Sequence, residues 1–369
     1  MLLRLSTLFA SPRLICSLTR PPTLRFLVSP KLARPLNRPP TLRFLATMST
    51  DPSKYKLNHT MLRVKDPQES LKFYQFLGMS LIDTIKNPDA KFDLYFLAYD
   101  GPDSVSKKNH RTDREGIIEL THNYGTESDP EYKIVNGNTE PYRGFGHVCI
   151  SVDNIQAACA RLETEGYKFQ KRLSDGQIRH IAFVLDPDGY WVEIIPRNPI
   201  ETTEDIKETS VDTYRMNHTM LRVKDINKSL AFYKDVMGMT LVRTLEMPNA
   251  KFNLYFLRYG PAPADAETAG SPTRNPNVGL EGLLELTYNY GTELDPAFKY
   301  HNGNDEPQGF GHIAVTVDDL ELACKRWEEP SLQVKWRKRL TEGRMKSIAF
   351  ILDPDGYWVE IVQNESLKK

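Results

Sequence analysis

The chain lacks two features that would assign it to large classes of protein. No apolar stretch approaches the roughly 18 residues that a membrane-spanning helix needs. Cysteine is scarce, with four in 369 residues and no CxxC pair among them. This spacing argues against a disulfide framework of the secreted type and predicts free thiols in a reducing compartment. We therefore expect neither a membrane span nor a disulfide.

An excess of basic charge is also missing from the body of the chain. The 48 basic and 48 acidic side chains balance, but residues 1–50 hold seven Arg, one Lys and no acidic residue. The other residues therefore carry 40 basic and 48 acidic side chains. No surplus of positive charge is left that would predict a nucleic-acid partner.

The first 47 residues differ in composition from everything that follows. They are rich in Arg, Ser, Leu and Pro, lack Asp and Glu, and contain the octapeptide RPPTLRFL twice. This composition is typical of a mitochondrial transit peptide, so we expect the full chain to be mitochondrial. The alternatives are a disordered tail and a start at Met48, which would give a cytosolic form.

The rest of the chain contains one sequence twice. The segments NHTMLRVKD, GFGH and DPDGYWVEI each recur 159 to 167 residues later. A period of this length predicts duplicated whole domains rather than short solenoid repeats. We expect a leader at 1–47, one domain at 55–197, a polar linker at 198–213 and a second domain at 214–365.

Each copy has the pattern of two successive units of one strand, one helix and three strands. In the first unit HTMLRV predicts a strand, DPQESLKFYQFLG a helix, and KFDLYFLAY and GIIELTHNY two further strands. In the second unit HVCISV predicts a strand and NIQAACARLETEG a helix, while IAFVL and YWVEII flank DPDG as a hairpin with a four-residue loop. We predict the α+β class, with four βαβββ units in two fused domains.

Side chains that could bind a metal recur on these strands. Residues four apart share one face of a strand and lie roughly 13 Å apart, so a ligand such as His59 shares its face with Arg63. A carboxylate such as Glu193, which follows Tyr-Trp-Val in an apolar strand, needs a partner when buried, and a metal is a strong one. Imidazole and carboxylate are ligands of Zn²⁺, Ni²⁺, Co²⁺ or Fe²⁺. The candidates are His59, Glu119, His147 and Glu193 in the first copy and His218, Glu285, His312 and Glu360 in the second.

These segments resemble glyoxalase I (lactoylglutathione lyase), and most closely its fused, double-length eukaryotic forms, over nearly all of residues 55–365. The resemblance implies the vicinal oxygen chelate fold, in which paired βαβββ units surround a divalent metal held by four side chains. In single-domain relatives each site lies between two subunits, so we expect the copies to share ligands and the chain to be a monomer with an internal pseudo-dimer. The expected sets are His59, Glu119, His312 and Glu360 (site one) and His218, Glu285, His147 and Glu193 (site two).

The resemblance also implies the reaction and the roles of residues in it. The substrate would be the hemithioacetal of glutathione and methylglyoxal, converted to S-D-lactoylglutathione through an enediolate that the metal stabilises. Glu193 and Glu360 would be the bases that move the proton. Zn²⁺ is the expected metal, with Ni²⁺ and Co²⁺ as alternatives.

Cations and amides would hold the glutathione part, and apolar side chains would line the pocket. The second copy has Gln308 where the first has Arg143, which removes one cation from site one. The residues expected to bind glutathione are Arg63, Asn123, Arg222, Asn289, Arg143, Lys171 and Lys338, and those expected to line the pocket are Leu94, Phe96, Phe183, Leu254, Phe256 and Phe350.

Two other functions stay open for this fold. An extradiol-type dioxygenase would hold Fe²⁺ with two His and one carboxylate, and the second carboxylate in each set argues against it. A metal-free ligand-binding protein would not need eight intact ligands.

Overall fold

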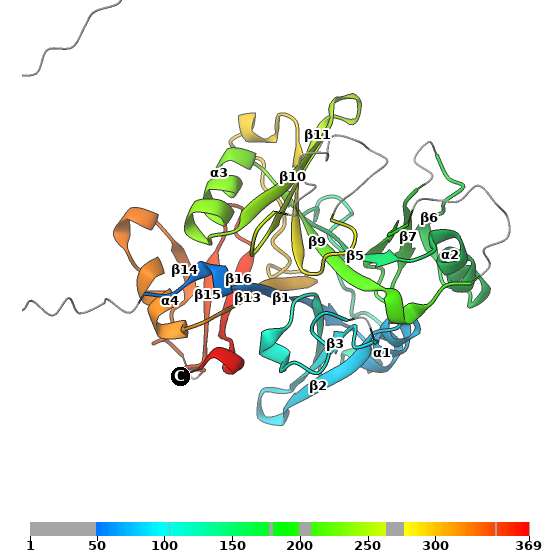
Figure 1. Ribbon diagram of the computed structural model, residues 1–369, viewed down its shortest axis with the longest axis horizontal. Coiled ribbons are helices and arrows are strands. Elements are labelled where there is room, and N and C mark those ends of the chain that lie inside the picture. The colour runs from blue at the N-terminus through cyan, green and yellow to red at the C-terminus, as the bar shows by residue number, and fades with distance from the viewer. Residues whose placement is uncertain are drawn as a thin grey trace, which may run out of the picture. The chain divides into compact units, whose positions relative to one another are not determined.

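The computed structural model describes residues 49–102, 104–176, 180–198, 208–262, 277–343 and 345–368 (Figure 1). The expected transit peptide lies outside these residues, and so does the middle of the expected linker. No helix of the described ranges is both long and apolar enough to cross a membrane. The three described cysteines are buried free thiols, as predicted.

The first copy folds as two successive βαβββ units. Asp66 caps the first helix, because its side chain accepts a hydrogen bond from the backbone N–H of Gln68. Gly78 follows the end of that helix with a φ of 90°, a conformation that glycine adopts without strain. The elements are β1 (Lys56–Val64), α1 (Pro67–Phe76), β2 (Ser80–Asn87), β3 (Phe92–Ala98), β4 (Ile117–Asn123), β5 (Phe145–Val152), α2 (Ile155–Thr164), β6 (Phe169–Lys171), β7 (Ala182–Leu185) and β8 (Trp191–Pro196).

The second copy repeats this order, which confirms the predicted α+β class and the four units. One helix differs, because it continues from α3 as a π-helical segment at Ala231–Val236, whereas α1 is α-helical throughout. The elements are β9 (Arg215–Val223), α3 (Ile226–Leu230), β10 (Thr240–Met247), β11 (Phe252–Arg258), β12 (Leu283–Asn289), β13 (Phe310–Val317), α4 (Leu320–Trp327), β14 (Lys335–Lys338), β15 (Ile348–Leu352) and β16 (Trp358–Gln363).

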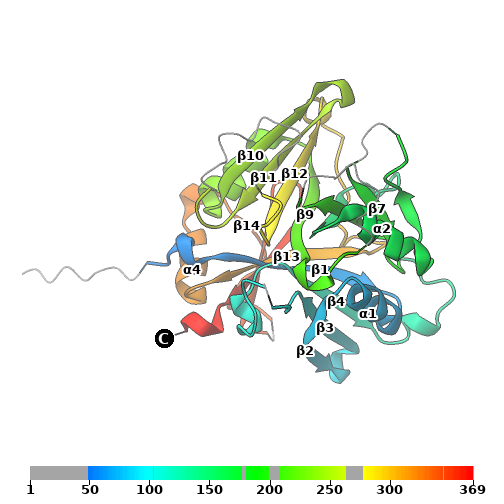
Figure 2. The same ribbon diagram turned by 45° about the vertical axis from the view of Figure 1, so that its right-hand side comes forward.

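The two copies exchange units in the sheets. One eight-stranded sheet has the order β14-β15-β16-β13-β1-β4-β3-β2, and the other has the order β10-β11-β12-β9-β5-β8-β7-β6. Each sheet therefore joins the first unit of one copy to the second unit of the other, through the antiparallel pairs β1–β13 and β5–β9. Figure 2 shows these central strands between the outer strands of the two sheets. In each sheet, segments that are distant in the sequence thus lie side by side.

Equivalent residues of the two copies meet between the sheets. The rings of Phe145 and Phe310 stack with centroids 4.9 Å apart and planes 10° apart, and both are almost completely buried. The hydroxyls of Thr60 and Thr219 also contact each other. In Figure 1 the helices α3 and α4 lie on one side of this centre and α1 and α2 on the other. The chain is thus arranged about an approximate two-fold axis, which gives it two equivalent sites.

The strand positions differ from the predicted pattern in two respects. The hairpin between β7 and β8 has a five-residue loop rather than four, because Tyr190 belongs to it and donates its backbone N–H to Asp186 at 2.8 Å. The hydrophobic pattern also does not locate β2 or β6. The residues of β2 are only partly buried and do not alternate, and β6 has three residues. Such strands carry little periodic signal.

Candidate metal centres

The first group of candidate ligands comes from four strands of one sheet. His59 on β1 and Glu119 on β4 belong to the first copy, and His312 on β13 and Glu360 on β16 belong to the second. The Nε2 atoms of the two histidines are 3.2 Å apart, and His59 Nε2 lies 3.1 Å from Glu119 Oε2 and 3.3 Å from Glu360 Oε2. All four side chains are buried, and one ligand atom from each lies within 4.8 Å of the others. We call this group site one.

The second group, site two, repeats this geometry in the other sheet. His147 and His218 have their Nε2 atoms 3.3 Å apart, and His218 Nε2 lies 3.0 Å from Glu285 Oε2 and 3.3 Å from Glu193 Oε2. The structure thus brings the eight residues together in the two cross-copy groups that the resemblance implied. Two imidazoles and two carboxylates in a buried cluster fit a divalent metal ion. Each site offers nitrogen donors from its histidines and oxygen donors from its glutamates, close enough together to bind one ion.

An asparagine beside each site orients one of the histidines. Asn58 donates its amide N–H groups to the carbonyls of Arg111 and Arg114, at 2.9 and 2.7 Å. Its Oδ1 therefore faces His59 and accepts from the ring Nδ1 at 2.8 Å. This arrangement places the proton on Nδ1 and leaves the lone pair of Nε2 for a metal. Asn217 makes the same contact with His218, and sequence reasoning missed both asparagines, although each directly precedes a candidate ligand.

Opposite charges within each site shift the pKa values of its members. Burial by itself would lower the pKa of His59, but Glu119 and Glu360 outweigh it and raise that pKa to about 9. Burial would raise the pKa of Glu360, yet His312 and His59 hold it well below its usual range. A metal binds only the deprotonated imidazole, so its binding competes with protons at these rings.

Each of the four imidazoles packs against a phenylalanine, and these are the four that sequence analysis assigned to the pocket. The ring centroids lie between 5.3 and 5.8 Å apart, and the rings are tilted edge to face. Such contacts restrict the orientation of the imidazoles. The pairs are His59–Phe96, His147–Phe183, His218–Phe256 and His312–Phe350.

The two sites differ at a residue of the central strands that is paired with two of their ligands. Cys149 on β5 is paired in register with His218 and Glu193, and it is fully buried. The equivalent residue of site one is Ala314, which is paired with His59 and Glu360. A thiol thus lies next to the ligands of site two, and a methyl group occupies this place in site one.

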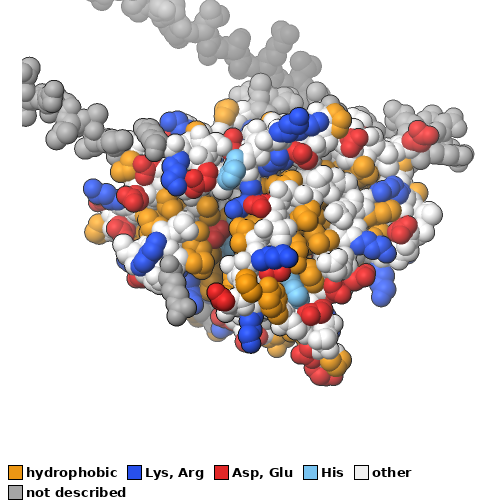
Figure 3. All heavy atoms as spheres, turned by 90° about the horizontal axis from the view of Figure 1, so that it is seen from below, with side chains coloured by type: hydrophobic (Ala, Val, Ile, Leu, Met, Phe, Trp, Pro, Cys, Tyr) orange, Lys and Arg blue, Asp and Glu red, His pale blue; other side chains and the backbone are white. Residues whose placement is uncertain are grey.

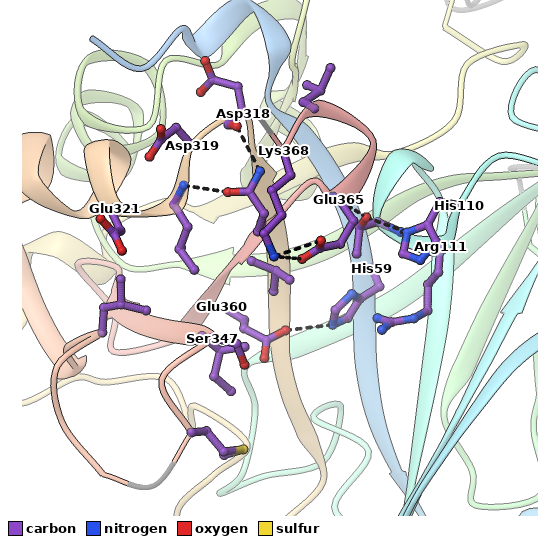
Figure 4. Close-up of a pocket in the computed structure, with 18 of the residues that line it drawn as sticks. His59, His110, Arg111, Asp318, Asp319, Glu321, Ser347, Glu360, Glu365 and Lys368 are labelled. Carbon is purple, nitrogen blue, oxygen red and sulfur yellow. Dashed lines mark hydrogen bonds and ion pairs between the residues drawn. The ribbon is translucent and has the colours of Figure 1, made fainter. Parts of the chain in front are cut away.

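A cavity of about 1270 Å³ leads to site one, and His59, Glu119 and Glu360 contribute to its lining. Leu94 and Phe96, both expected in the pocket, lie in its wall. Figure 4 shows Glu360 and His59 pointing toward each other, with Arg111 beside His59. On the face seen in Figure 3, hydrophobic side chains gather along a hollow that has Lys and Arg side chains near its rim. The cavity offers apolar walls, charged groups near the opening and metal ligands inside.

The arginines expected to bind glutathione make contacts between the copies. Arg63 donates to the carbonyl of Gly309 at 3.2 Å and to Oδ1 of Asn304 at 2.9 Å. Arg222 makes the equivalent contact with Oδ1 of Asn138, at 2.8 Å. The guanidinium groups thus hold a loop of the opposite copy, and Arg63 is not among the residues that line the cavity. Their binding to glutathione stays a prediction.

The other residues expected to bind glutathione have partners within the protein, and Lys171 and Lys338 lie opposite Phe183 and Phe350 in the sheets. Asn289 donates to the hydroxyl of Tyr300 at 3.0 Å, and Asn123 lies beside Tyr132, whose pKa it lowers against the effect of burial. Arg143 is paired with the exposed Glu140. The side chains of Gln308, Lys171 and Lys338 donate hydrogen bonds to backbone carbonyls. Gln308 donates to Asn304, and Lys171 donates to Ile181. Lys338 donates to Met345 and Ile348.

Paired βαβββ units that hold two buried His₂Glu₂ groups define a metal-binding enzyme with a small-molecule substrate. The model of the Glyoxalase/Bleomycin resistance protein/Dioxygenase superfamily matches residues 56–194 and 215–361. The lactoylglutathione lyase of Schizosaccharomyces pombe is 48% identical over 319 residues, which cover 86% of this chain and 99% of that protein. Glyoxalase I of Saccharomyces cerevisiae is 46% identical over 333 residues, covering 85% and 98%. The crystal structure of glyoxalase I from Zea mays superimposes with a TM-score of 0.59 at 27% identity, covering 84% and 92%. The chain belongs to the lactoylglutathione lyase (glyoxalase I) family.

Proposed function

We propose that both sites convert the hemithioacetal of glutathione and methylglyoxal into S-D-lactoylglutathione, which removes a toxic 2-oxoaldehyde. The observation that carries this proposal is the pair of buried His₂Glu₂ groups, one of which lies in a cavity with apolar walls. The relatives that share the whole length of the duplicated region are lactoylglutathione lyases. The reaction is an isomerisation, in which a proton leaves C1 and returns at C2, so no redox partner is needed.

The two carboxylates of each site are held differently, and this difference suggests which one is the base. Glu119 accepts a hydrogen bond from the hydroxyl of Thr121 at 3.2 Å, and Glu285 accepts one from Thr287 at 3.0 Å. Glu360 and Glu193 contact the histidines through Oε2, and within the described residues neither accepts a hydrogen bond from a hydroxyl group. A less anchored carboxylate can turn toward a substrate carbon, so Glu360 and Glu193 take up and return the proton.

A divalent metal, Zn²⁺ in our proposal, is held by the four side chains of each site. When bound, it supplies positive charge that stabilises the developing negative charge on the two substrate oxygens. Around it the protein excludes water, because every ligand is buried, and Asn58 and Asn217 hold two of the imidazoles in position. Ni²⁺ and Co²⁺ suit the same donors.

We further propose that the protein acts as a monomer, since each site is completed by residues of one chain. The leader at 1–47 would direct it to mitochondria, and a product that starts at Met48 would stay in the cytosol.

The experiment measures how fast a protein of residues 48–369 converts the hemithioacetal. The ultraviolet absorbance of the thioester product monitors the reaction. Exhaustive chelation should abolish turnover, and Zn²⁺, Ni²⁺ or Co²⁺ should restore it. Full activity of protein shown by metal analysis to be metal-free would overturn the proposal. Oxygen consumption with a catechol, without thioester formation, would instead identify a dioxygenase.

A further inference from the structure

The two sites carry different charges on the edge strands that flank them. In the first copy Asp83 lies on β2, and its carboxylate pairs with Arg111, whose Nε is 2.8 Å away. The guanidinium of Arg111 lies over the ring of Phe96, 4.2 Å from the ring centroid. Arg111 also lines the cavity of site one. Beside site one, therefore, a positive and a negative side chain neutralise each other.

In the second copy the equivalents of this pair are different residues. Alignment on the repeated segments AKFDLYFL and AKFNLYFL places Arg243 where the first copy has Asp83. Alignment on ELTHNYGTE and ELTYNYGTE places Asn277 where the first copy has Arg111. The acid is thus replaced by a base and the base by a neutral amide. Site two therefore has one positive charge that no acid at the equivalent position balances.

A bulge in β10 directs Arg243 toward site two. The register between β10 and β11 shifts between Leu241 and Arg243, which puts Arg243 directly opposite Phe256. Phe256 is in turn opposite Glu285, a ligand of site two, and its ring lies 5.5 Å from that of His218. Two strand spacings, about 10 Å, separate the backbones of Arg243 and Glu285, and a long side chain covers much of that distance. Bulges often re-aim a side chain beside an active site.

Arg243 is buried without a partner of its own. Its relative exposure is 7%, and within the described residues its guanidinium makes no hydrogen bond or ion pair, the fully buried Nε included. Burial lowers its pKa, and the charge of Glu285 opposes that shift. A buried cation with unused donors is unfavourable by itself, so a site that retains one has a use for it.

We propose that Arg243 binds a negatively charged oxygen of the substrate at site two. This inference rests on the proposed function, whose substrate offers two kinds of such oxygen. One is a carboxylate of the glutathione part, which a guanidinium binds through paired N–H donors. The other is an oxygen at the reacting carbons, which gains charge during the reaction. Site one has no equivalent free charge, because Arg111 is paired with Asp83.

The test uses an enzyme in which only site two turns over, made by Glu360→Gln. In this parent, Arg243→Gln should reduce kcat/KM about 10- to 100-fold, as expected for loss of a charge-assisted hydrogen bond. Arg243→Lys, which retains the charge but not the paired donors, should lose less. Lys234→Gln removes one exposed positive charge from the same copy and serves as the matched control. The effect of Arg243→Gln should be at least ten times larger in this parent than in the Glu193→Gln enzyme, where site one turns over.

Inhibition by S-methylglutathione, which cannot react, shows which of the two kinds of substrate oxygen Arg243 binds. A higher inhibition constant in the Arg243→Gln enzyme assigns the residue to a carboxylate, and S-methyl-γ-glutamylcysteine shows whether it is that of glycine. A lower kcat with an unchanged inhibition constant assigns it to the reacting end. Equal effects in both parents, or an effect no larger than that of Lys234→Gln, would overturn the proposal. If Arg243→Gln does not fold, unchanged kinetics of Arg243→Lys would overturn it equally. An inactive Glu360→Gln parent would instead contradict the proposed function of site two.

Discussion

The side-chain oxygen of Asn58 lies 2.8 Å from Nδ1 of His59 and fixes which ring nitrogen faces site one. The amide of Asn58 cannot turn over without losing its two bonds to backbone carbonyls. The orientation of this ligand is therefore set by a loop of the same copy. Partners of this kind tune metal affinity in many proteins.

Asn58→Ala should lower the metal affinity of site one by about 10- to 100-fold, because the imidazole loses its acceptor. Asn58→Asp retains an acceptor and should lose less. The measurement is competition for the metal against a chromophoric chelator, in which the wild-type protein binds two ions. Asn217→Ala should weaken site two by a similar factor. Unchanged affinity in both alanine variants would mean that the hydrogen bond has no part in ligand orientation.

The grouping of ligands predicts how inactivating changes combine. Glu360→Gln alone should leave the turnover of site two. Adding Glu119→Gln should not lower the turnover further, because both residues lie in site one. Adding Glu193→Gln should instead reduce turnover by about 100-fold or more, the scale of a lost general base. Steady-state rates of the three proteins decide this, and loss of all activity in the Glu119→Gln, Glu360→Gln protein would contradict the grouping.

The stacked pair between the copies predicts a loss of stability. Phe310→Ala should reduce the free energy of unfolding by about 3 to 5 kcal/mol, because Phe310 is buried against Phe145 and truncation leaves a cavity. Urea denaturation measures the change. Leu294→Ala, at a position that is 78% exposed, is the control and should change stability by less than about 0.5 kcal/mol. Equal losses in the two variants would show that the stack is not a stabilising contact.

Glu115 and Glu281 predict how stability depends on pH. Burial raises the pKa of each carboxyl to about 7, although nearby arginines oppose the shift. Between about pH 4.5 and 7 the folded protein holds these protons more tightly than the unfolded chain, so their contribution to stability falls as pH rises. Replacing both by Gln should stabilise the protein at pH 8, relative to pH 5, by up to about 2.5 kcal/mol for each carboxyl. Thermal unfolding of wild type and variant across this range tests it, and parallel curves would refute it.

Residues 1–47 should be dispensable for catalysis, because both ligand groups and the lining of the cavity lie within residues 49–368. Protein that starts at Met48 should match the full chain in kcat/KM within about twofold. A reporter fused to residues 1–47 should enter mitochondria. A reporter that stays in the cytosol would argue against the transit peptide.

The sequence by itself determined the repeat, the candidate ligands and the local elements around them. The local elements depend on residues that are close together in the sequence. Asp66 and Gly78 mark the two ends of a helix, and the alternation along IAFVL and YWVEII marks two strands. The eight His and Glu residues could be found because they recur at equivalent strand positions in both copies. Their division into two groups followed from the resemblance to single-domain relatives, since strand periodicity does not say which strands pair.

Only the tertiary structure decided which atoms meet. His59 and His312 are 253 residues apart and come together because β1 pairs with β13. The pairing sets the register, and a slip of one residue would turn every side chain to the opposite face. The same holds for Arg243, whose edge strand has no clear periodic pattern and whose direction depends on a bulge. The hydrophobic pattern of a strand predicts which face of the sheet a residue lies on. The neighbours of that residue depend on how distant segments of the chain pack together.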